Sequence, residues 1–122
     1  MAKNSAKPSI ECCPPKPHVA KRPLIESPQA GALSEIFKIL ANDTRLRLLH
    51  ALIRTEEICV TDLANAVGMS PQAVSNQLQR LVDRSIISSR RAGNQIFYRV
   101  VDPCIAILLD RGLCLLEDSD TK

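Results

Sequence analysis

The sequence predicts a mainly α-helical domain that carries one β-hairpin, an α+β fold class. The hydrophobic fraction is 45% but aromatic residues make up only 2%, so the core must be built from Leu, Ile, Val and Ala, which suits helices. Apolar residues recur at helical spacing along most of the chain after residue 32, and a single stretch at residues 85–101 alternates with period two. The length of 122 residues leaves room for one domain.

Residues 1–31 are predicted to form a flexible N-terminal arm. Most of the eight prolines lie in this part of the chain, and proline removes a backbone donor and disfavours helix in the residue before it. Two adjacent cysteines, Cys12 and Cys13, lie in the middle of the arm. Residues 1–33 carry five basic and two acidic side chains, which accounts for the whole net charge of +3.

Two helices are predicted to follow the arm. The first begins at Ala32 and ends before the letters ANDT, where Asn42 or Asp43 supplies a capping side chain for the second. The stretch RLRLLHALI then restarts the helical period.

A short helix, a tight turn and a longer helix come next. The short helix, VTDLANAV, begins near Thr61 or Asp62 and stops at Gly68. The longer one has Ser70 as its N-cap and Pro71 at the first helical position, where the missing N–H costs nothing, and it turns its apolar side chains inward at Val74, Leu78 and Leu81.

The alternating stretch predicts a hairpin with Gly93-Asn94 at its turn. A final helix begins at Pro103, and its apolar residues cover more than one face, which is typical of a helix that packs on a partner. This order of elements is that of a winged helix-turn-helix, in which the longer helix of the pair enters the major groove of DNA.

The outer face of that helix is suited to reading DNA. Its polar amides, hydroxyls and one guanidinium are able to bond base edges or phosphates, with Glu and Lys absent between Gln72 and Gln79. At the tip of the hairpin, Arg90 and Arg91 are placed to meet phosphates or a neighbouring minor groove. An ordinary solvated helix face and a solubilising hairpin tip are the alternatives. The predicted DNA-binding residues are Ser70, Gln72, Ser75, Asn76, Gln79, Arg80, Arg90 and Arg91.

Several classes of protein are excluded. No run approaches the roughly 18 apolar residues of a membrane span, and the start has no apolar segment of a signal peptide, so we expect a cytoplasmic protein with no membrane partner. Five cysteines in a reducing compartment point to thiolate chemistry, metals or packing rather than disulfides. An enzyme is not expected, because neither an H-E-x-x-H motif nor a His-Cys constellation is present.

Three stretches, LANDTRLRLLHALI, EICVTDLANAVGMSPQAVSNQLQRLVDRSII and RRAGNQIFYRVVD, resemble the ArsR/SmtB family of bacterial metal-sensing transcriptional repressors. The resemblance covers about residues 33–118, so we assign residues 32–118 to the DNA-binding and dimerisation domain and residues 119–122 to a tail. It implies a homodimer built on the first and last helices, which binds operator double-stranded DNA in its apo form and releases it when a metal ion binds.

The resemblance also implies a thiolate site at Cys59, at the start of the helix that precedes the recognition helix. Some members place a second cysteine two residues later, but here that position is Thr61. The remaining ligands are then expected from Cys12 and Cys13, which would give an S₃ site for a soft ion such as Cd(II), Pb(II), As(III) or Hg(II). A small buried hydrophobe at Cys59, and chance composition for the cysteine pair, are the alternatives.

A second site at the last helix is also implied by the family pattern. Asp102 and Cys104 fit its first half, with Cys in place of His, and Cys114 and Glu117 fit the second half one residue early. Since one residue turns a helix by about 100°, the second half is expected to be misdirected. Mixed oxygen and sulfur ligation there would also admit Zn(II), and packing of both cysteines in the core is the alternative.

One further function remains open for the same fold. Reversible oxidation or persulfidation of Cys12 or Cys13 would make the protein a thiol-redox sensor that needs no metal ion. The sequence alone names neither the inducing ion nor the operator, and it does not decide whether the arm reaches Cys59 of its own or of the other subunit.

Overall fold

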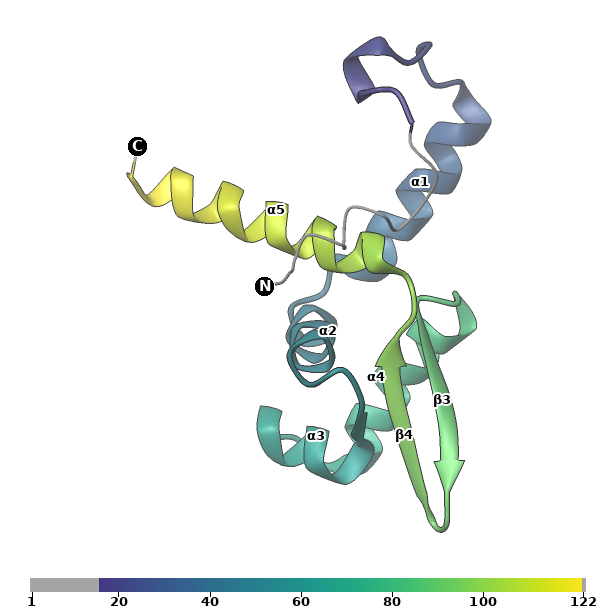
Figure 1. The fold of residues 1–122 in the computed structure, drawn as a ribbon, viewed down its shortest axis with the longest axis vertical. Helices are drawn as coiled ribbons and strands as arrows, with labels where there is room; N and C mark the ends of the chain where they lie inside the picture. Colours follow the sequence, from purple (N-terminus) through teal and green to yellow (C-terminus); the bar gives the residue numbers. More distant parts are fainter. Residues whose placement is uncertain (1–15, 122) are drawn as a thin grey trace.

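A computed structural model describes residues 16–121, with side chains through Asp118. Its elements follow the predicted order, with two short elements in addition, a 3₁₀ turn within the predicted arm and one strand (Figure 1). They are the 3₁₀ turn η2 (Val19–Lys21), α1 (Ser27–Leu40), α2 (Asp43–Thr55), β2 (Ile58–Cys59), α3 (Val60–Val67), α4 (Pro71–Asp83), β3 (Ile87–Ala92), β4 (Gln95–Val100) and α5 (Pro103–Thr121).

The first helix begins earlier than predicted, at Ser27 rather than Ala32. Its start is fixed by Glu26, whose N–H donates to Gln29 Oε1 over 3.0 Å, and by Pro28 in the first turn. Proline is compatible with that turn because the N–H it lacks has no intrahelical partner there. The prediction assigned the whole proline-rich stretch to an arm without regular structure, so its helix begins five residues too late.

The cap of α2 is Asn42, whose Oδ1 accepts from Arg45 N over 3.0 Å. The start of α3 differs by one or two residues from the prediction near Thr61 or Asp62: the helix begins at Val60, because Cys59 ends β2 in extended backbone and serves directly as the N-cap. The turn between α3 and α4 and the N-cap of α4 are as predicted. Gly68 is left-handed with φ of 71°, and the Ser70 side chain accepts from Ala73 N.

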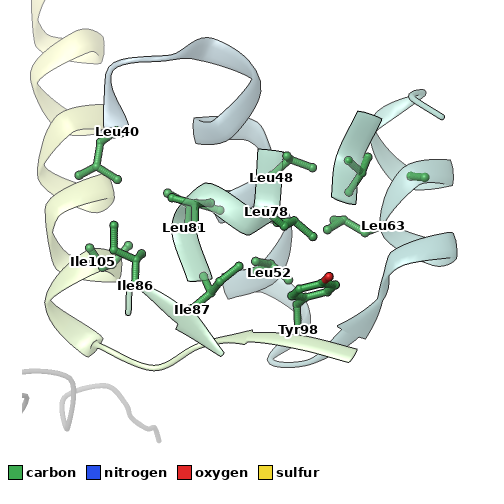
Figure 2. Close-up of a cluster of buried hydrophobic side chains, with 13 residues drawn as sticks. Leu40, Leu48, Leu52, Leu63, Leu78, Leu81, Ile86, Ile87, Tyr98 and Ile105 are labelled. Atoms are coloured by element: carbon green, nitrogen blue, oxygen red, sulfur yellow. The ribbon is translucent and has the colours of Figure 1, made fainter. Parts of the chain in front are cut away.

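The core lies between the helix-turn-helix and the hairpin. As predicted, α4 buries Val74, Leu78 and Leu81. These side chains meet leucines of α2 and α3, and the hairpin closes the cluster from the other side (Figure 2). Its fully buried members are Leu48, Leu49, Leu52, Leu63, Val74, Leu78, Leu81 and Ile87.

The sheet has three strands in the order β2-β4-β3, all antiparallel. The hairpin turns at Gly93-Asn94, as predicted, with Gly93 at φ of 66°. The third strand, β2, was not predicted, because two residues are too few to show alternation. It pairs Ile58 with Tyr98 and Cys59 with Phe97.

A strained turn joins α2 to β2. Glu56 has φ of 68° and ψ of −49°, and the N–H of Glu57 donates to the carbonyl of Thr55 over 2.7 Å. This three-residue hydrogen-bonded loop is the rare γ-turn, which is unfavourable for a residue with a Cβ. Glu57, the residue after this turn, contacts Arg90 of the hairpin.

Replacing Glu56 with glycine is expected to raise the free energy of unfolding by about 0.5–1 kcal/mol, because glycine adopts positive φ without a Cβ clash. Urea denaturation at fixed protein concentration measures the change. Glu56→Ala loses the same carboxylate but keeps a Cβ, so it should bring no gain. An equal gain in the free energy of unfolding from Glu56→Ala would mean that loss of the carboxylate, rather than relief of backbone strain, stabilises the protein.

No helix in the described part of the chain combines the length and the apolar character that crossing a membrane requires.

Candidate DNA-binding surface and thiol sites

The recognition helix candidate α4 presents a polar face to solvent. Gln72, Asn76, Gln79 and Arg80 are exposed, as predicted, whereas Ser75 is half-buried and therefore less available than expected. The exposed amides make side-chain hydrogen bonds along the helix. Gln72 Nε2 donates to Asn76 Oδ1 over 3.0 Å, and Gln79 Nε2 donates to Asp83 Oδ1 over 2.8 Å. Such amides offer both donors and acceptors to base edges.

The N-terminal end of this face is held by its cap. The Ser70 side chain is exposed, and its Oγ accepts from Ala73 N over 3.2 Å. The hydroxyl proton is still available for donation, so the cap and the predicted contact to DNA are compatible.

One arginine that the sequence analysis did not select joins three elements. Arg45 Nε donates to the carbonyl of Ile39 at the end of α1 over 2.6 Å, and Arg45 Nη1 donates to Gln77 Oε1 of α4 over 2.9 Å. A single guanidinium thus connects α1 to the recognition helix candidate. Arg45 and Gln77 are 32 residues apart, so no local pattern in the sequence marks the pair.

The two arginines of the hairpin have different surroundings. Arg91 is exposed near the tip. Arg90 donates from Nε and Nη2 to the two carboxylate oxygens of Glu57, both over 2.8 Å, and its guanidinium lies 4.9 Å from the centre of the Phe97 ring. Arg90 was predicted to meet phosphates or a neighbouring minor groove, whereas in the structure its partner is Glu57.

The same contact shifts the ionisation of both groups. The hydrogen bond from Arg90 lowers the pKa of Glu57 below its ordinary value, and the charges of Arg90 and Arg99 act in the same direction. The hydrogen bond to Glu57 raises the pKa of Arg90 in turn. Glu57 is therefore ionised at neutral pH and holds the guanidinium by a charge-assisted, bidentate contact.

Cys59 is placed where the resemblance implies, immediately before α3, and only 3% of its surface is exposed. This burial agrees with the packing alternative for the side chain, and an ion would reach its Sγ only after neighbouring groups move. Cys12 and Cys13, the other predicted ligands, lie outside the described residues.

The residues of the second predicted site are all exposed at α5. Asp102 Oδ1 accepts from Cys104 N over 2.9 Å, and Cys114 lies ten residues beyond Cys104, which is about 15 Å along a helix. One protomer therefore does not bring both halves to one ion. Packing in the protomer core, the alternative for these cysteines, is wrong, because both side chains are on its surface.

Among residues 16–118, no group of three or more His, Cys, Asp or Glu side chains is arranged to hold a metal ion. The described part of one protomer thus supplies only fragments of either predicted site. The sequence prediction takes the remaining ligands of the first site from Cys12 and Cys13, which lie outside the described residues.

Apolar side chains remain uncovered on α1 and α5. A groove of about 550 Å³ runs between α1, α2 and α5, lined by Phe37, Leu46, His50, Leu108 and Leu113 among others. Leu115 and Leu116 near the end of α5 are 70% and 60% exposed. A surface of this kind, on the two helices that the resemblance assigns to dimerisation, is typical of a protein–protein interface.

Comparison with known proteins matches residues 42–89, from the cap of α2 into β3, to the bacterial regulatory protein, arsR family. The transcriptional repressor SmtB homolog of Synechocystis sp. is 39% identical over 92 residues, which make up 75% of this chain and 69% of that protein.

Solved structures agree with this match. The crystal structure of the AntR antimony-specific transcriptional repressor is 59% identical with a TM-score of 0.78, and the match covers 90% of this chain and 99% of AntR. The homodimeric winged helix-turn-helix DNA-binding domain of Mb0332 from Mycobacterium bovis is 28% identical with a TM-score of 0.66, over 78% and 90% of the two chains. The fold and the relatives together confirm the sequence prediction: this chain belongs to the ArsR/SmtB family of metal-sensing transcriptional regulators, and its fold is a winged helix-turn-helix.

Proposed function

We propose that this protein is a transcriptional repressor that binds operator DNA as an apo homodimer and is released when a soft metal or metalloid ion binds its cysteine thiolates. The observation that carries the proposal is the exposed polar face of α4, with Gln72, Asn76, Gln79 and Arg80 presented on a helix held by a buried apolar face. A face of amides and one guanidinium suits the major groove, where each base pair presents a distinct pattern of donors and acceptors. The exposed Arg91 adds a phosphate contact from the wing.

The apolar surfaces of α1 and α5 support the homodimer. Phe37 on α1 and Leu113, Leu115 and Leu116 on α5 are each more than 40% exposed in the single protomer, and a second copy would remove them from water. Mb0332, which is similar to this chain, is described as homodimeric. A twofold pairing would present two copies of α4 to successive major grooves, about 34–36 Å apart on one side of the DNA.

The effector is proposed from the cysteines and from AntR. Cys59 with Cys12 and Cys13 would make an S₃ site, which favours soft ions. Because AntR is named as antimony-specific and is 59% identical to this chain, Sb(III) joins As(III), Cd(II), Pb(II) and Hg(II) as a candidate inducer. Zn(II) remains a candidate for the α5 site, where Asp102 and Cys104 of one protomer would need Cys114 and Glu117 of its partner. We place the protein in the cytoplasm, where its DNA target lies.

An operator titration tests the proposal. Fluorescence anisotropy with labelled DNA from upstream of the protein's own gene would report the apo Kd, and each ion would then be added in turn. We expect at least one ion to weaken operator binding by about 5–150-fold, the usual range of allosteric coupling. The same titration on Cys12→Ser, Cys13→Ser and Cys59→Ser variants should show little or no release while apo binding is retained.

The controls separate the competing sites and chemistries. A double Cys104→Ser, Cys114→Ser variant should keep the release by Sb(III) and lose only an effect of Zn(II). Ion-induced release that survives serine at positions 12, 13 and 59 together would exclude the S₃ site. Release by a mild oxidant or a persulfide donor, with no stoichiometric metal, would select the thiol-redox sensor instead.

A further inference from the structure

A row of side chains crosses the outer face of the sheet. Cys59 on β2 is directly opposite Phe97 on β4, and Phe97 is directly opposite Arg90 on β3. Residues directly opposite in an antiparallel pair share one face of the sheet. The neighbouring row, Ile58 and Tyr98, includes the buried Tyr98 of the core, so the row with Cys59 lies on the opposite face of the sheet. On that face Arg90 is exposed, Phe97 is half-buried and Cys59 is buried.

The side chain of Arg90 spans this row. Strands β3 and β2 are separated by β4, and two strand spacings amount to about 9–10 Å. Arg90 bridges the interval by lying over the Phe97 ring at 4.9 Å and bonding both carboxylate oxygens of Glu57, which lies two residues before Cys59. We call Arg90, Phe97 and Glu57 the wing strap, because they join the outer strand of the wing to the segment that carries Cys59.

The wing strap lies beside the only described thiol of the proposed S₃ site. Cys59 is 3% exposed, so an ion bonded to its Sγ at about 2.3–2.6 Å needs space that side chains of this neighbourhood now fill. Glu57 is also held by the strained γ-turn at Glu56. A displacement of the Cys59 segment would therefore be transmitted to Glu57 and to the bidentate contact.

We propose that the wing strap holds the wing in its DNA-binding position and that an ion on Cys59 opens it. The inference rests on the proposed function, since it supplies the route from the thiolate to the wing. In this arrangement Arg90 is a positioning residue, and Arg91, exposed beside it, is the wing arginine that meets phosphate. A wing fixed in advance loses less conformational freedom when DNA binds, so the closed strap favours the complex.

Two single substitutions at adjacent glutamates test the inference. Glu57→Gln breaks the charge-assisted contact, whereas Glu56→Gln removes the same charge one residue away and leaves the strap intact. Both variants gain the same long-range attraction to DNA, so their difference reports the loss of the Arg90–Glu57 contact. Relative to Glu56→Gln, we expect Glu57→Gln to bind the operator about fivefold or more weakly in the apo form, the lower end of usual coupling strengths.

The response to an ion gives the second measurement. With Sb(III), supplied as potassium antimonyl tartrate, the ratio of loaded to apo Kd should fall about fivefold or more in Glu57→Gln, because the strap is already open. Arg90→Gln and the double variant with Glu57→Gln should match the single variant, since both changes break one contact. Arg91→Gln should weaken binding in both states and leave the ratio unchanged.

The outcomes separate the inference from the function on which it rests. If the wild type is not released by any tested ion, the proposed function fails, and the comparison of apo affinities between the two glutamate variants still decides whether the strap positions the wing. If an ion releases the wild type and the two variants have equal apo affinities and equal ion responses, the wing strap does not position the wing. Tighter apo binding by Glu57→Gln than by Glu56→Gln would also overturn it, because the contact would then be withholding Arg90 from DNA.

Discussion

Replacing Leu78 with alanine is expected to lower the free energy of unfolding by about 2–5 kcal/mol. Leu78 is fully buried in α4, at the point where α2, α3 and the hairpin meet (Figure 2). Truncation loses the transfer free energy of the removed methyl groups and leaves a cavity that leucines on neighbouring helices fill only in part. Since small domains are stable by only about 5–15 kcal/mol, this one substitution removes a large fraction of the total.

Urea denaturation at a fixed protein concentration measures the loss, because the stability of a dimer depends on protomer concentration. Gln79→Ala, the neighbouring residue on the exposed face, is the matched control and should change the free energy of unfolding by no more than about 0.5 kcal/mol. A loss below about 1 kcal/mol for Leu78→Ala would mean that the core of α4 is packed less tightly than the burial of its side chains indicates.

Replacing Arg45 with methionine is expected to lower the free energy of unfolding by about 1–3 kcal/mol. The substitution keeps much of the apolar stem but removes the donors to the Ile39 carbonyl and to Gln77 Oε1. Both acceptors are part-buried, so losing the donor leaves them poorly solvated. Because these two bonds connect α1 to α4, the operator affinity of the apo protein should fall as well.

Two variants show whether geometry or charge is responsible. Arg45→Lys keeps the positive charge but lacks the planar fork that reaches two acceptors, so it should rescue little of the loss. Arg47→Lys, two residues along α2, disturbs a single longer bond of 3.3 Å to the carbonyl of Val67 and should cost no more than about 0.5 kcal/mol. A double-mutant cycle with Gln77→Ala should give a coupling of at least about 0.5 kcal/mol, and a value near zero would contradict a direct role for the pair.

The helix-turn-helix was predictable because its signals are local. Gly68 takes the left-handed conformation that ends α3, and Ser70 with Pro71 starts α4. The two-residue turn at Gly93-Asn94 likewise sets the hairpin. Each of these signals acts within four residues of chain, so the sequence contains the whole interaction.

The errors of prediction arose where a local signal had two interpretations, or where the outcome depended on contacts between distant elements. Pro28 breaks a helix interior but is tolerated in a first turn, and it stands in the first turn of α1. β2 exists only because β4 offers it a pairing edge. Ser75 was predicted to face outward, but the packing of the helix leaves it half-buried.

The sequence by itself determined the order of elements, the apolar face of α4, the polar face that it presents and the family to which the chain belongs, because each depends on spacing along a few turns. Only the tertiary structure decided the partners of the long cationic side chains. Arg90 meets Glu57 across 33 residues and Arg45 meets Gln77 across 32. A flexible side chain binds whichever acceptor the fold brings within reach, and the folded arrangement of strands and helices, rather than the neighbouring residues, sets that distance.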